Sequence, residues 1–305
     1  MRINSGQNES SPRLDILTSP GWNDYELLDS GDGQKLERYG AYTFVRPEHR
    51  AAWQPALPAS VWEQAHATFK PTGKESGGHW QFHKPVERSW VMGYRELRFR
   101  VQASAARHLG FFPEQANHWD WLGEQIRSSG RPISVLNLFA YTGLASLAAA
   151  QAGAQVTHVD AAKRAVKTAQ ENQALSGLED RPIRWIVDDA IKFVHREGRR
   201  SSRYEGFILD PPKFGRGPDG QVWEFFRSFP ELLQACRAIF SDRPLFMLIT
   251  AYAIQGSALT IYYPLQEIVS GLGGSLTCGE LALQDSSANR LLSTALFARW
   301  STSSK

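Results

Sequence analysis

The chain has 305 residues, of which 42% are hydrophobic and 21% charged, an ordinary composition for a globular protein with a sizeable core. The formal net charge is only +3, which gives weak support to long-range attraction of nucleic acid. No stretch approaches the length of a membrane span, so the sequence excludes a membrane-spanning helix.

The N-terminal stretch MRINSGQNESSPRLD is polar and lacks the apolar core of a signal peptide. Cys236 and Cys278 are too few for a disulfide framework or a metal-ligand cluster, and they fit a reducing compartment. His79 and His83 are accompanied by neither an H-E-x-x-H pattern nor a nearby cysteine. We therefore expect a cytoplasmic protein that binds neither a membrane nor a metal ion. The sequence leaves its oligomeric state open.

The first part of the chain differs from the rest. Gly31, Gly33 and Gly40 separate short strand-like runs. The segment VWEQAHATF could form a short helix, while GGHWQFH, SWVMGY and ELRFRV alternate as strands of an antiparallel hairpin do. The sequence predicts a small β-rich N-terminal extension over residues 1–107 and a second domain over residues 108–305.

The end of this extension is basic. Residues 70–107 contain eight lysines and arginines and three glutamates, a local balance of +5, so the rest of the chain carries +3 minus +5, or −2. Aromatic residues lie beside these charges: Phe69, Trp80, Phe82, Trp90, Tyr94 and Phe99. They could stack on the bases of a single-stranded nucleic acid, or face a core while the charges face water. We expect the core for most of them, with a charged outer face that can still contact RNA.

A helix is predicted to begin at Pro113 and to end before Gly130 and Pro132. The next stretch, VLNLFAYTG at residues 135–143, is followed by the alanine-rich LASLAAAQAG, which predicts a buried parallel strand that turns into a helix. The first N–H groups of that helix lack internal partners, and Gly143 lets the chain pass close to a ligand.

A second predicted strand ends at Asp160, where an acidic residue can accept hydrogen bonds from ribose hydroxyls. A helix that Gly177 can end follows it. A nucleoside derivative is therefore the expected ligand. A dinucleotide is disfavoured, because Phe139 and Tyr141 occupy positions where a pyrophosphate site needs glycine.

Two more strands follow. IRWIVDDAIKFV predicts a strand that leads into a helix at Asp188 and Asp189, and FILDPPKFG predicts a strand that ends at Asp210. Consecutive prolines cannot extend a central strand, so Pro211 and Pro212 form a rigid corner. Each aspartate alone could be a solvated turn or a helix N-cap. Together they favour a ligand crevice at the carboxyl ends of the strands, formed by Gly143, Asp160, Asp189 and Asp210.

The remaining segments complete a sheet. KFGRGPDG predicts a loop, and QVWEFFRSFPELLQACRAIF a helix with a break at Pro230. PLFMLIT predicts a fifth strand and SALTIYYPLQEIVSGLGG a helix, and two final strands are SLTCGELAL and LLSTALFARW.

These motifs resemble those of class I S-adenosylmethionine-dependent methyltransferases. Their acidic-x-Gly-x-Gly-x-Gly motif aligns with Asn137, Phe139, Tyr141 and Gly143, of which only the last is glycine. The FAYTG turn and the later motifs are similar to the ribosomal RNA methyltransferase branch related to the 23S cytosine-C5 enzymes. The resemblance covers roughly residues 109–300. It implies an α/β fold with a doubly wound, seven-stranded, mostly parallel sheet, and S-adenosyl-L-methionine as cofactor.

The resemblance also implies site residues. A G-x-[FY]-x-D-Q-R segment borders the cofactor in that family, and here Glu114 and Gln115 match it loosely, although they could simply complement a helix dipole. Asp189 would lie beside the adenine amino group. The expected cofactor-binding residues are Glu114, Gln115, Asn137, Phe139, Tyr141, Thr142, Gly143, Asp160, Asp188, Asp189 and Ala190. The expected catalytic residues are Asp210, Pro211, Pro212 and Lys213.

Direct methyl displacement mainly requires that a nucleophile be aligned with the sulfur–carbon bond. Asp210 and the carbonyl of Pro211 could hold an exocyclic amine for this purpose. Methylation of cytosine C5 would instead need a cysteine nucleophile. The resembled enzymes carry it just beyond the fifth strand, where this chain has Thr250, Ala251 and Tyr252. Cys236 belongs to an apolar helical stripe that indicates a core position.

We therefore expect a methyltransferase that acts on a nitrogen of an RNA base, with Lys213 and Arg216 as further phosphate contacts. No complete RNA-binding PUA domain, which the resembled enzymes carry, is recognisable in the first hundred residues. One alternative is a small-molecule or protein methyltransferase. Another is a non-catalytic nucleic-acid- or cofactor-binding module, although the intact aspartates and DPP corner argue against it.

Overall fold

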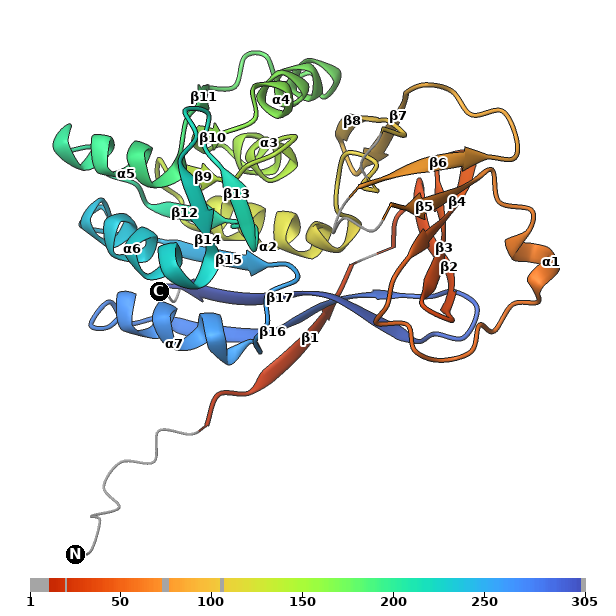
Figure 1. Ribbon diagram of the computed structural model, residues 1–305. Coiled ribbons are helices and arrows are strands. Elements are labelled where there is room, and N and C mark those ends of the chain that lie inside the picture. Colours follow the sequence, from red (N-terminus) through yellow and green to blue (C-terminus); the bar gives the residue numbers. More distant parts are fainter. Residues whose placement is uncertain (1–10, 20, 73–76, 105–106, 303–305) are drawn as a thin grey trace, which may run out of the picture.

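The computed structural model describes residues 11–19, 21–72, 77–104 and 107–302. Figure 1 shows a large sheet flanked by helices and, beside it, a smaller β-rich part. In the described part of the chain, no helix is long and apolar enough to cross a membrane.

The large sheet has eight strands in the order β1-β16-β17-β15-β12-β9-β10-β11. Neighbouring strands are parallel except where β17 pairs with β15 and with β16. The predicted α/β fold and mostly parallel seven-stranded sheet are confirmed, and β1 is an eighth strand that the sequence did not predict. The strands are β1 (Leu14–Thr18), β9 (Ser134–Leu138), β10 (Gln155–Asp160), β11 (Ile183–Val187), β12 (Gly206–Leu209), β15 (Phe246–Ala251), β16 (Ser275–Gln284) and β17 (Leu291–Ser301).

Helices cover both faces of this sheet, which explains why all residues of the central strand β12 are buried. On one face lie α2 (Ala116–Ser128), α3 (Leu144–Gln151) and α4 (Lys163–Leu175), with the short 3-10 helix η1 (Pro113–Gln115) ahead of α2. On the other face lie α5 (Ala190–Arg199), α6 (Phe225–Ala238) and α7 (Leu259–Ile268). Between β12 and α6, the predicted loop contains β13 (Phe214–Arg216), which forms a hairpin with β14 (Val222–Glu224). The helix predicted over residues 221–240 is wrong at its start, because residues 222–224 pair with β13 and α6 begins at Phe225.

The break expected at Pro230 is wrong, because α6 runs through it. Proline has no N–H to donate to the carbonyl four residues earlier, which belongs to Phe226. Phe226 is exposed, so water can satisfy that carbonyl and the helix can continue.

The smaller part contains a five-stranded sheet in the order β2-β3-β4-β5-β6 and a separate hairpin of β7 and β8. The predicted β-rich N-terminal extension is confirmed. The helix expected in VWEQAHATF is limited to α1, because its last residues begin strand β5 and alternate between buried and half-buried positions. The bounds are β2 (Tyr25–Gly31), β3 (Gln34–Tyr39), β4 (Tyr42–Pro47), α1 (Ala59–Trp62), β5 (Ala67–Pro71), β6 (Gly78–Phe82), β7 (Trp90–Tyr94) and β8 (Leu97–Val101).

The aromatic residues near the basic segment mostly belong to the core. Phe69, Tyr94 and Phe99 are buried, and Trp80 and Trp90 pack against the core cluster that contains Tyr94 and Phe99. Phe82 is the exception, since 52% of it is exposed. The core interpretation is therefore confirmed for these residues apart from Phe82.

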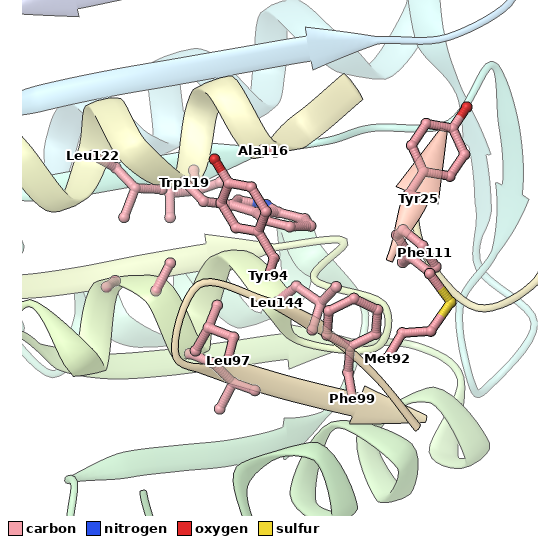
Figure 2. Close-up of a cluster of buried hydrophobic side chains, with 14 of the residues drawn as sticks. Tyr25, Met92, Tyr94, Leu97, Phe99, Phe111, Ala116, Trp119, Leu122 and Leu144 are labelled. Carbon is pink, nitrogen blue, oxygen red and sulfur yellow. The ribbon is translucent and has the colours of Figure 1, made fainter. Parts of the chain in front are cut away.

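One core joins the two parts of the molecule. Figure 2 shows side chains of β2, the β7–β8 hairpin, α2 and α3 packed together. Trp119 of α2 lies against Tyr94 of β7, with ring centroids 5.6 Å apart. The β16–β17 hairpin also reaches the small sheet (Figure 1), where Asp285 accepts a 2.9 Å hydrogen bond from the hydroxyl of Ser30. The domain boundary at residue 107 lies within this continuous packing and stays a prediction.

Candidate cofactor and acceptor site

The turn after β9 has an unusual backbone. Phe139, Tyr141 and Gly143 have left-handed φ angles of 56°, 48° and 88°. A left-handed residue other than glycine costs roughly 1–2 kcal/mol, so surrounding contacts must hold it. Phe139 packs on Trp223 of β14, with ring centroids 4.8 Å apart. The positions where the resembled motif has glycine thus keep a backbone that glycine favours, even where aromatic side chains are present.

At Gly143 the lack of a side chain is required by space as well as by its backbone. A Cβ atom there would lie 2.7 Å from the Cβ of Ala169 in α4. Since α3 begins directly after Gly143, a larger residue would push the start of α3 away from α4.

Asp160, at the end of β10, is tied to this turn. Its Oδ2 accepts a 2.7 Å hydrogen bond from the N–H of Tyr141, and its Oδ1 accepts a 2.8 Å bond from the N–H of Ala162. Burial raises the pKa of Asp160, while these two bonds oppose the change. A carboxylate has roughly four lone-pair sites. Asp160 can therefore hold the turn and still accept hydrogen bonds from a ligand.

Hydrogen bonds of Asn137 and Thr142 hold the turn in place. The Nδ2 of Asn137 donates a 2.9 Å hydrogen bond to the hydroxyl of Ser146 in α3. The hydroxyl of Thr142 donates to the carbonyl of Gly110 at 2.7 Å, and the side chain of Asn172 donates to the Thr142 carbonyl at 3.0 Å. Both residues thus support the turn through local bonds.

A pocket with about 460 Å³ of empty space lies over this turn. Its walls come from the segment before α2, the β9–α3 turn and the ends of β12 and β15. Among the residues predicted from sequence, it is lined by Gln115, Asn137, Phe139, Tyr141, Thr142, Gly143 and Asp210. Its further lining residues are Phe111, Phe112, Trp119, Ala140, Leu144, Ala145, Ile208 and Thr250. We call it the cofactor pocket.

Five predicted cofactor-binding residues are not among the described residues that line it: Glu114, Asp160, Asp188, Asp189 and Ala190. Asp189 caps α5 by accepting a 3.0 Å hydrogen bond from the N–H of Lys192. Asp188 forms a 2.5 Å ion pair with Arg196, and Ala190 is buried. Asp189 is thus a helix N-cap, the local role that the sequence also allowed for it, and Asp188 makes a local ion pair. Their role toward the cofactor stays a prediction.

Asp210 faces the cofactor pocket from the end of β12. Its Oδ2 accepts a 3.2 Å hydrogen bond from the side-chain amide of Gln115. Burial raises the pKa of Asp210 to about 8, with further contributions from the negative charges of Glu114 and Asp160. A carboxyl group with this pKa can accept or release a proton near neutral pH.

The β13–β14 hairpin holds the corner after Asp210. The carbonyl of Pro212 accepts a 2.6 Å hydrogen bond from the indole N–H of Trp223, and the carbonyl of Lys213 accepts a 3.0 Å bond from the N–H of Phe225. Pro211 is buried and Pro212 and Lys213 are half-buried. The corner is thus rigid, with Asp210 as its pocket-lining side chain.

Some site residues were missed from the sequence. Thr250 lies near the end of β15, the fifth strand predicted for the large sheet, and its position at a strand end could have indicated that it lines the site. Trp119 is an aromatic residue in a helix, and nothing in its pattern distinguishes it from a core residue. Tyr252, in the stretch where the resembled enzymes carry a cysteine, accepts a 3.2 Å hydrogen bond from Gln115. Burial, then the nearby Glu114 and Asp210, raise its pKa.

Neither cysteine is near the reacting corner. Cys236 lies in α6 and Cys278 in β16; both are fully buried, and neither lines the cofactor pocket. Burial raises the pKa of the Cys236 thiol, which disfavours the thiolate that a nucleophile requires. In the described residues, no group of three or more His, Cys, Asp or Glu side chains could hold a metal ion.

The family model of the S-adenosylmethionine-dependent methyltransferases matches residues 47–242. The chain belongs to this family. The predicted family, enzyme class and cofactor are thereby confirmed. The matched residues include the β9–α3 turn, Asp160, and the corner at Asp210, as well as the end of the N-terminal extension.

A solved S-adenosylmethionine-dependent methyltransferase from Agrobacterium tumefaciens is 45% identical, with a TM-score of 0.90 over 96% of this chain and 97% of that chain. Ribosomal RNA large subunit methyltransferase I of Shewanella denitrificans is 39% identical over 119 residues, which are 39% of this chain and 29% of that protein. Methyltransferase K/L of a Shewanella species, also a ribosomal RNA large subunit enzyme, is 31% identical over 163 residues, 52% of this chain and 22% of that protein. The chain thus spans less than a third of these ribosomal RNA methyltransferases.

The cofactor pocket suits this methyltransferase's cofactor, S-adenosylmethionine. Phe139 and Tyr141 give the pocket aromatic surface, and Asp160, which does not line the pocket itself, binds the backbone of Tyr141 and keeps lone pairs for hydroxyl groups. A positive charge placed near Asp210 would oppose the rise in its pKa that burial causes and would favour its ionised form. The residues present therefore fit a nucleoside that carries a sulfonium.

Proposed function

We propose that this methyltransferase transfers a methyl group directly to a nitrogen of an RNA base. The observation that carries the proposal is Asp210, a partly enclosed carboxyl at the rim of the cofactor pocket whose pKa burial raises to about 8. The names of the ribosomal RNA methyltransferases that match part of the chain support RNA as the acceptor.

In this proposal the cofactor-binding residues are those predicted from the sequence, with Asp160 accepting ribose hydroxyls and Gln115 near the reacting end. S-adenosylmethionine supplies a methyl group already activated by its sulfonium. Residues 108–305 form the cofactor-binding domain, and residues 1–107 contact the substrate. Lys213 and Arg216 follow the corner as phosphate contacts.

Asp210 and the carbonyl of Pro211 accept hydrogen bonds from the N–H groups of the acceptor amine. This holds the nitrogen lone pair toward the methyl carbon. Direct transfer would form the nitrogen–carbon bond and leave the electrons of the broken carbon–sulfur bond on sulfur. The nitrogen would then release one proton. Asp210 could accept it in its ionised form, which the positive charge of a bound sulfonium favours against the effect of burial. No cysteine is required for this route.

The test is transfer of labelled methyl from S-adenosylmethionine to total RNA from cells that lack the protein, followed by digestion to nucleosides. We expect label on a base nitrogen and a loss of roughly 100-fold or more in the Asp210→Asn variant, with S-adenosylhomocysteine still bound. Label in protein or small molecules alone would replace RNA as the acceptor. Cofactor binding without transfer to any of the three would contradict the enzymatic proposal.

A further inference from the structure

A second pocket, with about 520 Å³ of empty space, adjoins the cofactor pocket. The two share Phe111 and Phe112 in their walls. Side chains of the N-terminal extension meet those of the methyltransferase domain here, among them Lys35, Arg46, Glu48, Arg50, Arg107, Glu114 and Tyr252. We call it the basic pocket.

Most cations of this pocket have a carboxylate partner. Arg46 binds Glu37 with an Nε–Oε2 distance of 2.6 Å, and the Nζ of Lys35 lies 3.5 Å from Glu37. Glu37 itself does not line the pocket. Arg50 lies 3.8 Å from Glu48 and also donates a hydrogen bond to a backbone carbonyl. These pairs leave the pocket wall rigid.

Arg107 differs from its neighbours. Among the residues that the structure describes, no carboxylate lies within ion-pair distance of it, and its Nε donates a 3.4 Å hydrogen bond to the Nε2 of His108. Burial lowers the pKa of Arg107, the negative charge of Glu48 opposes this, and the positive charges of Arg46 and Arg50 act in the same direction as burial. A half-buried guanidinium among other cations is an anion site that the chain itself does not fill.

Two aromatic residues of the basic pocket adjoin the reacting corner. Phe112 and Tyr252 have ring centroids 4.9 Å apart. The amide of Gln115 lies 3.2 Å from the Tyr252 hydroxyl and 3.2 Å from Asp210, so it links this end to the cofactor pocket. The basic pocket therefore offers two aromatic rings, tilted by 40°, near Asp210, and its lining also includes the guanidinium of Arg107, which has no ion-pair partner among the described residues.

We propose that the basic pocket receives the acceptor nucleotide, with its base against Phe112 and Tyr252 and its phosphate at Arg107 and Arg50. This inference rests on the proposed function and specifies the acceptor as a nucleotide bound through its phosphate. Aromatic side chains stack on a base of any sequence, and the planar fork of arginine matches two phosphate oxygens. Arg50 and Arg107, which would contact the phosphate, both belong to the N-terminal extension.

The direct test is calorimetric titration of the protein saturated with S-adenosylhomocysteine, using ribonucleoside 5′- and 3′-monophosphates and the corresponding nucleosides. We compare wild type, Arg107→Gln, Arg107→Lys and the surface control Arg199→Gln, which lies at the far end of α5. Arg107→Gln should weaken monophosphate binding by roughly 10- to 100-fold and leave nucleoside binding unchanged. Arg107→Lys should recover part of the loss. Equal monophosphate affinity in Arg107→Gln and Arg199→Gln would overturn the proposal.

Folding can be controlled for. The substitution leaves the backbone carbonyl of Arg107, which accepts a 2.9 Å hydrogen bond from Arg46, and unchanged S-adenosylhomocysteine affinity reports an intact domain. Should Arg107→Gln fail this control, Arg50→Gln replaces it, with a loss of monophosphate binding again expected and unchanged binding contradicting the site.

The outcomes also separate this inference from the proposed function. Methyl transfer to RNA that is equal in Arg107→Gln and wild type, with monophosphate binding unaffected, would keep the function and remove the phosphate site. Arg107-dependent monophosphate binding without transfer to RNA would keep the site and identify a free nucleotide, in place of an RNA phosphodiester, as the source of the phosphate.

Discussion

The backbone N–H of Tyr141 donates a 2.7 Å hydrogen bond to the carboxylate of Asp160, so the residue that closes β10 also fixes the turn that closes β9. The second oxygen of Asp160 accepts the N–H of Ala162. One side chain thus holds the two backbone segments against which the cofactor is proposed to lie.

We expect Asp160→Asn to damage both stability and cofactor binding. An asparagine has one oxygen, so its NH₂ group would face the N–H of either Tyr141 or Ala162. An unsatisfied group of this kind costs roughly 1–3 kcal/mol. Urea unfolding should show that loss, and titration with S-adenosylhomocysteine should show affinity reduced by roughly 10-fold or more. Asp180→Asn, at an exposed position, is the matched control. Wild-type affinity in Asp160→Asn would contradict the role of this carboxylate.

Gly143→Ala tests whether contact with α4 or backbone conformation alone requires glycine. The added Cβ would lie 2.7 Å from Ala169, whereas at Gly177, with φ of +64°, nothing lies within 4 Å. Gly177→Ala should cost about 1–2 kcal/mol from its left-handed backbone. Gly143→Ala should cost a further 1–3 kcal/mol, roughly, from overpacking and also weaken cofactor binding. Similar unfolding free energies for the two variants would show that the contact is easily relieved.

The raised pKa of Asp210 predicts a pH dependence of stability. In the folded protein the carboxyl keeps its proton up to about pH 8, while in the unfolded chain it loses it near the ordinary value of 3.8. The folded state therefore binds more protons in this range, and its stabilisation, complete below pH 3.8, is lost as the pH rises through 8. Between these two pKa values the unfolding free energy falls by up to about 1.4 kcal/mol for each pH unit.

Asp210→Asn removes this titration, so groups common to both proteins cancel in the comparison. Without cofactor, the variant should gain stability relative to wild type as the pH is raised from 5 toward 8. Urea unfolding at several pH values measures the difference. Parallel curves for the two proteins would mean that Asp210 titrates normally.

The wall of the basic pocket depends on a buried ion pair. Burial raises the pKa of Glu37, but Arg46 and Lys35 more than offset this and lower it to about 2. Glu37→Gln leaves the Arg46 guanidinium buried without its charge partner and should cost roughly 3–5 kcal/mol. Replacing both, as Glu37→Leu with Arg46→Met, should recover much of that loss. The coupling would be contradicted if the double variant lost as much unfolding free energy as Glu37→Leu and Arg46→Met lose when their separate losses are added.

The large sheet could be predicted because its strands are apolar runs separated by helical segments of regular length. The ends of those strands also placed Asp160 and Asp210 in one region. Strand β1 could not be predicted in the sheet, because a short stretch at residues 14–18 carries a weak pattern and its partner strand is far along the chain.

The conformation of Phe139 and Tyr141 could not be predicted either, because aromatic residues disfavour left-handed backbone and only contacts such as that with Trp223 impose it. The basic pocket was missed for a different reason. Lys35 and Arg107 come from separate segments of the extension, and no local pattern shows that they face Tyr252.

Ser30 and Asp285, which are 255 positions apart, are joined by a hydrogen bond, and β1 lies against β16. A ribosome makes the residues of the extension first and their partners in the β16–β17 hairpin last. Domains usually fold in the order of synthesis. Here, however, β1 and β2 are made well before the β16–β17 hairpin that they contact. The nascent chain therefore exposes unpaired strand edges for most of its synthesis, and we expect its folding to be slow and to benefit from chaperones.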